Sequence, residues 1–124
     1  MEHDSRPGGA LVLIAEDDQE IAELIAAAVE HIHATPMLAR DGQEALELVQ
    51  SCAPDLVITD LVMPGMGGDT LIAAIRNKWG AELPAILVSG APWQHRRASG
   101  ADAVLPKPFR VGDLLALMGR YLAA

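Results

Sequence analysis

Short apolar runs alternate with helical patterns along almost the whole of this 124-residue chain. Runs of strand length cover residues 10–15, 35–39, 56–58, 83–88 and 103–105. Uninterrupted apolar runs such as the first are typical of strands that are buried on both faces of a parallel sheet. The second run contains Pro36, which has no backbone N–H to donate and therefore favours a place near the edge of the sheet.

Amphipathic helices are predicted between the runs, because apolar residues recur there at intervals of three and four. In the first helix these residues are Ile21, Leu24, Ile25, Ala28, Val29 and Ile32. Asp18 is placed to cap this helix, and Asp41 with Glu44 has the spacing of a capping box for the next one. Helices are predicted over residues 19–31, 41–52, 68–78 and 111–122, with a weak, short or irregular segment over 91–100.

Strict alternation of buried strands and amphipathic helices predicts an α/β fold, a doubly wound parallel sheet with helices on both faces. Functional sites in such folds lie beyond the carboxyl ends of the strands, near the point where the strand order reverses. Polar side chains follow four of the five predicted strands at this end, and they are Glu16, Asp17, Asp18, Asp60, Ser89 and Lys107.

The composition narrows the class of protein. A formal net charge of −8 argues against a nucleic-acid surface, which would need a basic stripe. No run approaches the roughly 20 apolar residues of a membrane span, and no signal pattern opens the chain, so a cytoplasmic protein is expected. Residues 1–9 are polar and contain Pro-Gly-Gly, which predicts a disordered lead-in to one domain over residues 10–124.

The side chains at the strand ends suit the attack of a carboxylate on phosphorus. Two like charges ~4 Å apart repel by about 4 kcal/mol at an effective dielectric constant of 20. Mg²⁺ would relieve this repulsion, because it prefers carboxylate and phosphate oxygens. A lysine and a hydroxyl could then hold the remaining phosphoryl charge. Taken singly, each residue also has a plain interpretation as a helix cap, a turn residue or a surface lysine.

Several longer motifs make the chain resemble the receiver domains of bacterial two-component response regulators, over nearly all of residues 11–122. The matching segments are LIAEDD at 13–18, DGQEAL at 41–46, PDLVITDLVMP at 54–64 and GADAVLPKPF at 100–109. The block at 60–68 and the Lys-Pro-Phe ending are together highly specific. The resemblance implies a flavodoxin-like sheet with strand order 2-1-3-4-5.

The resemblance also implies a role for each residue of the site. Asp60 would be the phospho-acceptor, Ser89 the switch hydroxyl and Lys107 the lysine that contacts the phosphoryl group. Mg²⁺ would be bound by Asp17, Asp60 and the backbone carbonyl of Val62, with Glu16 bound through water. Asp18 would then be a helix cap, and the Lys107–Pro108 peptide bond would be cis.

The function implied by the resemblance is phosphorelay signal transduction. A sensor histidine kinase or a histidine phosphotransfer protein would supply the phosphoryl group, and hydrolysis would reset the switch. Such a domain catalyses its own modification, but it is not an enzyme in the usual sense. The partner-binding surface, or a homodimer interface, would be the face made by helix 4, strand 5 and helix 5. The chain is interpreted either as a free-standing regulator or as a receiver from a larger protein.

Two departures from the family pattern keep other functions open. Val104 replaces the aromatic residue that many family members carry three positions before the lysine, and the span from Ser89 to Lys107 predicts a shortened helix 4. A pseudo-receiver, which binds partners without phosphorylation, is therefore the alternative. A phosphohydrolase is disfavoured because Val62 stands where a second acid would be needed. A flavin- or nucleotide-binding doubly wound domain is disfavoured because the loop after the first strand is acidic and not glycine-rich.

Overall fold

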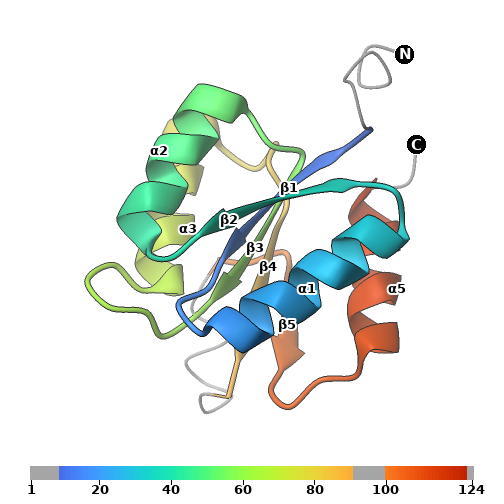
Figure 1. The fold of residues 1–124 in the computed structure, drawn as a ribbon. Helices are drawn as coiled ribbons and strands as arrows, with labels where there is room; N and C mark the ends of the chain where they lie inside the picture. Colours follow the sequence, from blue (N-terminus) through green and yellow to red (C-terminus); the bar gives the residue numbers. More distant parts are fainter. Residues whose placement is uncertain (1–8, 91–99, 123–124) are drawn as a thin grey trace.

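The computed structural model describes residues 9–90 and 100–122 of the chain. These residues form one parallel sheet in the order β2-β1-β3-β4-β5, as the resemblance implied, with helices on both faces (Figure 1). The elements are β1 (Leu11–Ala15), α1 (Gln19–His31), β2 (Thr35–Ala39), α2 (Gly42–Cys52), β3 (Leu56–Asp60), α3 (Gly68–Trp79), β4 (Ala85–Ser89), β5 (Ala103–Pro106) and α5 (Val111–Leu122). The predicted lead-in, apart from residue 9, and the irregular segment at 91–99 lie outside the described residues.

The core has two layers because the side chains of each strand alternate between the two faces of the sheet. Val12 and Ile14 of β1 pack on the side of α1 and α5, whereas Leu13 and Ala15 pack on the side of α2 and α3. All four side chains are fully buried. Figure 1 shows this arrangement, with α1 and α5 covering one face and α2 and α3 the other. Burial on both faces explains why the strands are continuous apolar runs.

Parallel pairing brings the carboxyl ends of the strands to one edge of the sheet. β3 lies between β1 and β4, with Ala15 opposite Thr59 and Asp60 opposite Val88. β2, which contains Pro36, is an edge strand as predicted. The last residues of β1, β3 and β4 therefore lie side by side, and the polar residues that follow them share one edge.

The predicted helix caps are present. Oδ1 of Asp18 accepts hydrogen bonds from the backbone N–H groups of Glu20 and Ile21 at the start of α1, at 3.0 and 3.2 Å. Oδ1 of Asp41 accepts from the N–H of Glu44 at 2.8 Å. The reciprocal bond of this capping box differs from expectation, because the Glu44 carboxylate accepts from the N–H of Arg40, one residue before the cap.

Some details of the predicted elements were wrong. β4 begins at Ala85, two residues later than expected, whereas α3 continues to Trp79 before Gly80 ends it with a positive φ of 69°. Leu24 belongs to the apolar stripe of α1, yet 44% of its surface is exposed. The stripe is wider than the surface that the sheet and α5 cover. None of the helices in the described ranges is long and apolar enough to span a membrane.

Asp102 joins three elements at the amino ends of β4 and β5. Its Oδ2 atom accepts from the N–H of Ala85 at 2.8 Å and from Nη2 of Arg76, at the end of α3, at 2.6 Å. Nη1 of Arg76 also donates to the carbonyl oxygen of Leu83 at 2.7 Å. The hydroxyl of Tyr121 donates to the carbonyl of Asp102 at 3.1 Å. This network fixes the start of β5 against β4, α3 and α5.

Replacing Asp102 with alanine should lower the free energy of unfolding by about 1–3 kcal/mol, because the N–H of Ala85 and a guanidinium lose their acceptor. Urea denaturation followed by circular dichroism measures this change. Glu30→Ala removes an exposed acid from α1, and it should change stability by less than about 0.5 kcal/mol. Equal effects of the two substitutions would contradict a stabilising role for the network.

Candidate phospho-acceptor site

Asp60 is the last residue of β3 and is only 8% exposed. Every residue of this strand is buried, so the strand holds Asp60 in a rigid position at the edge of the sheet. The next residue, Leu61, still donates its backbone N–H to the carbonyl of Val88 on β4 at 3.1 Å. A loop over residues 61–67 then leads to α3. The carboxylate of Asp60 is therefore delivered by a strand that has little freedom to move.

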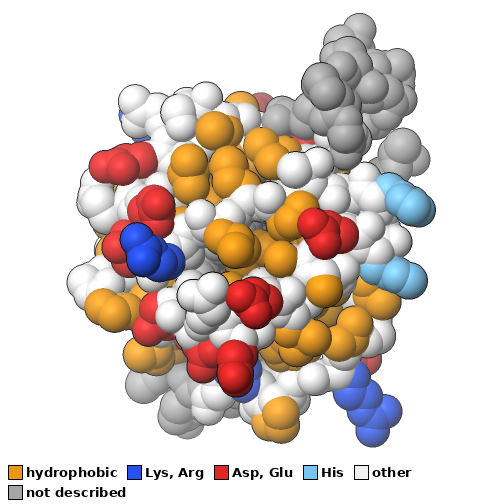
Figure 2. All heavy atoms as spheres, in the orientation of Figure 1, with side chains coloured by type: hydrophobic (Ala, Val, Ile, Leu, Met, Phe, Trp, Pro, Cys, Tyr) orange, Lys and Arg blue, Asp and Glu red, His pale blue; other side chains and the backbone are white. Residues whose placement is uncertain are grey.

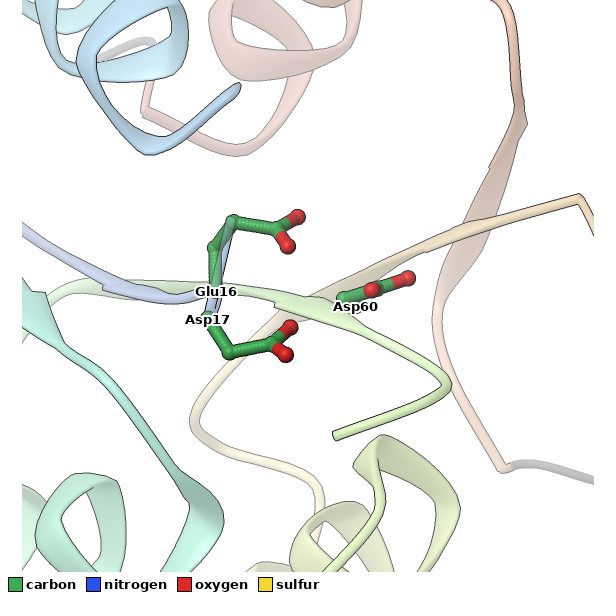
Figure 3. A group of neighbouring side chains, drawn as sticks. All are labelled: Glu16, Asp17 and Asp60. Atoms are coloured by element: carbon green, nitrogen blue, oxygen red, sulfur yellow. The ribbon is translucent and has the colours of Figure 1, made fainter. Parts of the chain in front are cut away.

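Two further acids, Glu16 and Asp17, follow β1, the neighbour of β3. Their carboxylate oxygens and those of Asp60 include atoms that all lie within 4.8 Å of one another. Figure 3 shows the three side chains projecting in the same direction from the ends of the two strands. Glu16 and Asp60 are buried, whereas Asp17 is exposed. The sheet thus holds three negative groups at one small place.

Lys107 follows β5 and supplies a positive charge to this cluster. Its Nζ atom lies 3.3 Å from Oδ2 of Asp60 and 3.6 Å from Oε1 of Glu16. The N–H of Lys107 donates to the carbonyl of Ser89 at 3.0 Å, which ties the lysine to the end of β4. The bond between Lys107 and Pro108 is cis, as expected. Ser89 is itself buried as the last residue of β4.

Glu16 carries the electrostatic cost of this arrangement. Its pKa is raised from 4.5 to about 7, mainly by burial and in part by the charges of Asp60 and Asp17. The backbone N–H of Asp18, which donates to Oε2 of Glu16 at 3.1 Å, and the charge of Lys107 act in the opposite direction on this pKa. Oε1 of Glu16 is buried and has no hydrogen-bond partner in the structure. The three carboxylates of the site thus face only one ammonium within ion-pair distance among the described residues.

The surface next to this cluster is acidic as well. A hollow of about 220 Å³ beside Glu16 and Asp17 is also lined by Glu23, Glu44 and Arg40, so four acids face one arginine. Figure 2 shows acidic side chains gathered in the lower part of this face, toward the carboxyl ends of the strands. A partner or ligand that approaches from this side meets a negative potential, which favours positively charged groups.

The structure brings most residues of the sequence-based site to one place. Glu16, Asp17, Asp60 and Lys107 come together, and Ser89 ends the strand beside Asp60. Val62 lies two residues beyond Asp60, with a side chain that is 72% exposed.

Two residues near Asp60 were not predicted, Thr59 and Gly68. The hydroxyl of Thr59 donates to the backbone carbonyl of Asp60 at 2.9 Å, and Gly68 packs against that same carbonyl. The glycines around the start of α3 indicated close backbone packing, but the sequence does not identify the backbone atoms against which they pack.

Comparisons with known proteins identify the family of this chain. The family model of the response regulator receiver domain matches residues 12–118. This chain belongs to that family. Response regulator MprA of Mycolicibacterium vanbaalenii is 33% identical over 115 residues, which cover 90% of this chain and 49% of MprA. The chain therefore spans about half the length of this relative.

Solved receiver structures have the same fold. The receiver domain of the Francisella response regulator 1452 is 29% identical, with a TM-score of 0.84, and the match covers 92% of this chain and 97% of that one. The receiver domain of the sensor histidine kinase PA1611 from Pseudomonas aeruginosa has a TM-score of 0.85 at 23% identity, over 94% and 99% of the two chains. That structure holds a magnesium ion in its active-site cleft.

The raised pKa of Glu16 predicts how Glu16→Gln changes the stability of the protein when a chelator keeps metal ions away. The folded state favours the neutral form of Glu16. The stabilisation that this form gives to the folded protein is therefore fully present below pH 4.5 and is lost as the pH rises through about 7. Glutamine keeps an oxygen for the N–H of Asp18 but carries no charge. The variant should therefore melt at a higher temperature than the wild type at pH 8, and the difference between the two melting temperatures should shrink at pH 5. A gap that stays constant in calorimetry between these pH values would contradict the expectation.

Proposed function

We propose that this receiver domain takes a phosphoryl group onto Asp60 and releases it again, as one step of a phosphorelay. One observation carries the proposal. A buried carboxylate at a strand end lies 3.3 Å from the ammonium of Lys107 and belongs to a cluster with two other carboxylates. A purely structural role does not account for this grouping, because it leaves a buried oxygen of Glu16 without a hydrogen-bond partner.

Asp60 acts as the nucleophile. One of its carboxylate oxygens attacks the phosphorus of a phosphohistidine, an O–P bond forms and the P–N bond breaks. The electron pair leaves with the imidazole, which takes up a proton. A water molecule later attacks the aspartyl phosphate, which restores the carboxylate of Asp60 and releases inorganic phosphate. The domain promotes both steps on itself, and we class it as a signalling module and not as an enzyme.

Lys107 and Ser89 act on the charge that arrives with the phosphoryl group. A carboxylate carries one negative charge, whereas an acyl phosphate carries up to two. Lys107 already lies within ion-pair distance of Asp60, so its ammonium is placed to follow the charge onto the phosphoryl oxygens. Ser89 ends β4, the strand next to β3, and its hydroxyl can donate a hydrogen bond to the same group.

The donor set fits Mg²⁺. Glu16, Asp17 and Asp60 offer carboxylate oxygens within 4.8 Å of one another, and hard oxygen ligands of this kind are those that Mg²⁺ prefers. The buried oxygen of Glu16 that has no hydrogen-bond partner also fits a cation nearby. Asp17 and Asp60 would hold the ion, with the backbone carbonyl of Val62, and Glu16 would act through water. When bound, Mg²⁺ would neutralise charge on the phosphoryl oxygens.

The partners follow from this chemistry. A sensor histidine kinase or a histidine phosphotransfer protein in the cytoplasm would donate the phosphoryl group. The added charge at Asp60, which attracts Lys107, would alter the face that contains β5 and α5, where an output protein or a second copy would bind. This part of the proposal rests on the position of Lys107 directly after β5 and before α5.

Incubation with acetyl phosphate and Mg²⁺ should add one phosphoryl group to the wild-type protein, as measured by intact-mass spectrometry. Asp60→Asn should show no incorporation, because an amide is a poor nucleophile toward phosphorus. Asp55→Asn is a suitable control, since Asp55 precedes β3 at its far end and should leave the incorporation intact. If the wild type is not labelled while another receiver is, the pseudo-receiver becomes the preferred interpretation.

Mg²⁺ binding should depend on Asp17 and not on its neighbour Asp18. We expect Asp17→Asn to weaken the binding of Mg²⁺ at least tenfold in isothermal titration calorimetry, about 1.4 kcal/mol, because a carboxylate ligand becomes a neutral amide. Asp18→Asn should change it much less, since Asp18 caps α1 with its side chain. An equal loss in both variants would show that general acidity attracts the ion and that no specific site exists.

A further inference from the structure

The backbone carbonyl of Asp60 is contacted by two groups that the proposed chemistry does not use. The hydroxyl of Thr59 donates a hydrogen bond to this oxygen at 2.9 Å. Gly68, the first residue of α3, lies against the same carbonyl from across the loop. The N–H of Gly68 also donates to the carbonyl of Leu61 at 2.8 Å. The start of α3 is therefore packed directly onto the peptide that carries the acceptor.

The packing at Gly68 leaves no room for a side chain. A Cβ atom at this position would lie 2.1 Å from the carbonyl oxygen of Asp60, 2.9 Å from its carbonyl carbon and 3.1 Å from the Cα atom of Leu61. All three are backbone atoms, which cannot move aside by a change of rotamer. Any larger residue must displace either the Asp60 peptide or the first turn of α3. Glycine is required here by close approach, and not by a positive φ angle.

Thr59 is fully buried, with 0% of its surface exposed, and lies next to Asp60 in β3. A buried hydroxyl is costly unless it is hydrogen-bonded, and this one bonds to the peptide of the acceptor. Valine has nearly the same shape but lacks the hydroxyl, whereas serine keeps the hydroxyl and lacks the methyl group. The pair of substitutions therefore separates the hydrogen bond from the packing.

We propose that Thr59 and Gly68 are positioning residues that set the direction of the Asp60 carboxylate by fixing its peptide from two sides. This inference rests on the proposed phosphoryl transfer to Asp60. The side chain and the carbonyl group of Asp60 share one Cα atom, so a shift of the peptide also moves the carboxylate. That carboxylate must stay near Lys107, now 3.3 Å away. A misplacement of about 1 Å at a reacting group can cost 100-fold in rate.

Two glycines of α5 provide a matched control. A Cβ atom added at Gly112 or Gly119 would meet no heavy atom within 4 Å. Alanine at these positions should be accommodated and should even stabilise the helix slightly, because alanine has the higher helix propensity. Gly119→Ala therefore makes the same chemical change as Gly68→Ala at a position where nothing has to move.

The test measures the rate of labelling by acetyl phosphate with Mg²⁺ for each variant, corrected for the folded fraction from circular dichroism. We expect Gly68→Ala to be labelled at least tenfold more slowly than the wild type, and Gly119→Ala to match the wild type. Thr59→Val should also be slowed severalfold, whereas Thr59→Ser should regain most of the rate. The amide signal of Leu61 in ¹H–¹⁵N spectra should shift in Gly68→Ala and in Thr59→Val. This signal reports directly on the displaced peptide.

The outcomes separate this inference from the proposed function. A wild type that is not labelled at all would overturn the phosphoryl-transfer proposal itself. A wild type that is labelled, together with Gly68→Ala and Thr59→Val at the same rate per folded molecule, would overturn the positioning role alone. If Gly68→Ala does not fold, Thr59→Val decides the question, and a loss in Thr59→Ser as large as in Thr59→Val would refute the role of the hydroxyl.

Discussion

Repulsion between three carboxylates at one edge of the sheet is the constraint on which the rest of the structure depends. Glu16, Asp17 and Asp60 are held with carboxylate oxygens within 4.8 Å of one another. Among the described residues, Lys107 is the cation that lies within ion-pair distance of this cluster. Left to themselves, such groups would separate or take up protons. Burial first, and then the charges of Asp60 and Asp17, raise the pKa of Glu16 to about 7, which favours the uptake of a proton at this residue. The proposed binding of a cation and then of a phosphoryl group would have to overcome this electrostatic cost.

The parallel sheet supplies the rigidity that keeps the acids together. β1 and β3 are buried on both faces and are joined by backbone hydrogen bonds, so the carboxylates cannot move apart without disrupting two core layers. The two ends of β5 have different roles. Asp102 fixes the start of this strand through Arg76 and Ala85, whereas its far end carries Lys107 to the acids. At β5, therefore, a hydrogen-bond network lies at the amino end and the electrostatic cost at the carboxyl end.

Much of this site was predictable from the sequence because parallel strands bring the residues at their carboxyl ends together, whatever the distance in the chain. Asp60 and Lys107 could be placed in one crevice for that reason alone. The contact of Gly68 with the Asp60 carbonyl could not be predicted, since it depends on how far the loop before α3 folds back. The bond between Arg76 and Asp102 was missed because its partners are 26 residues apart, and the order of the elements does not say which side chains meet there. Periodicity likewise identified the apolar stripe of α1, but not that Leu24 lies outside the part that other elements cover.

Val104 limits how the proposed phosphorylation could be read by a partner. It lies in the middle of β5, opposite Leu87, and packs partly buried against the core layer of α2 and α3. A β-branched side chain is restricted at χ1 and has no polar tip, so burying or exposing it could change the surface only slightly. An aromatic ring at this position could bury or expose a far larger area. A readout of the proposed phosphorylation would therefore depend less on Val104 than on Lys107 and Ser89, which are joined by the hydrogen bond from the N–H of Lys107 to the carbonyl of Ser89.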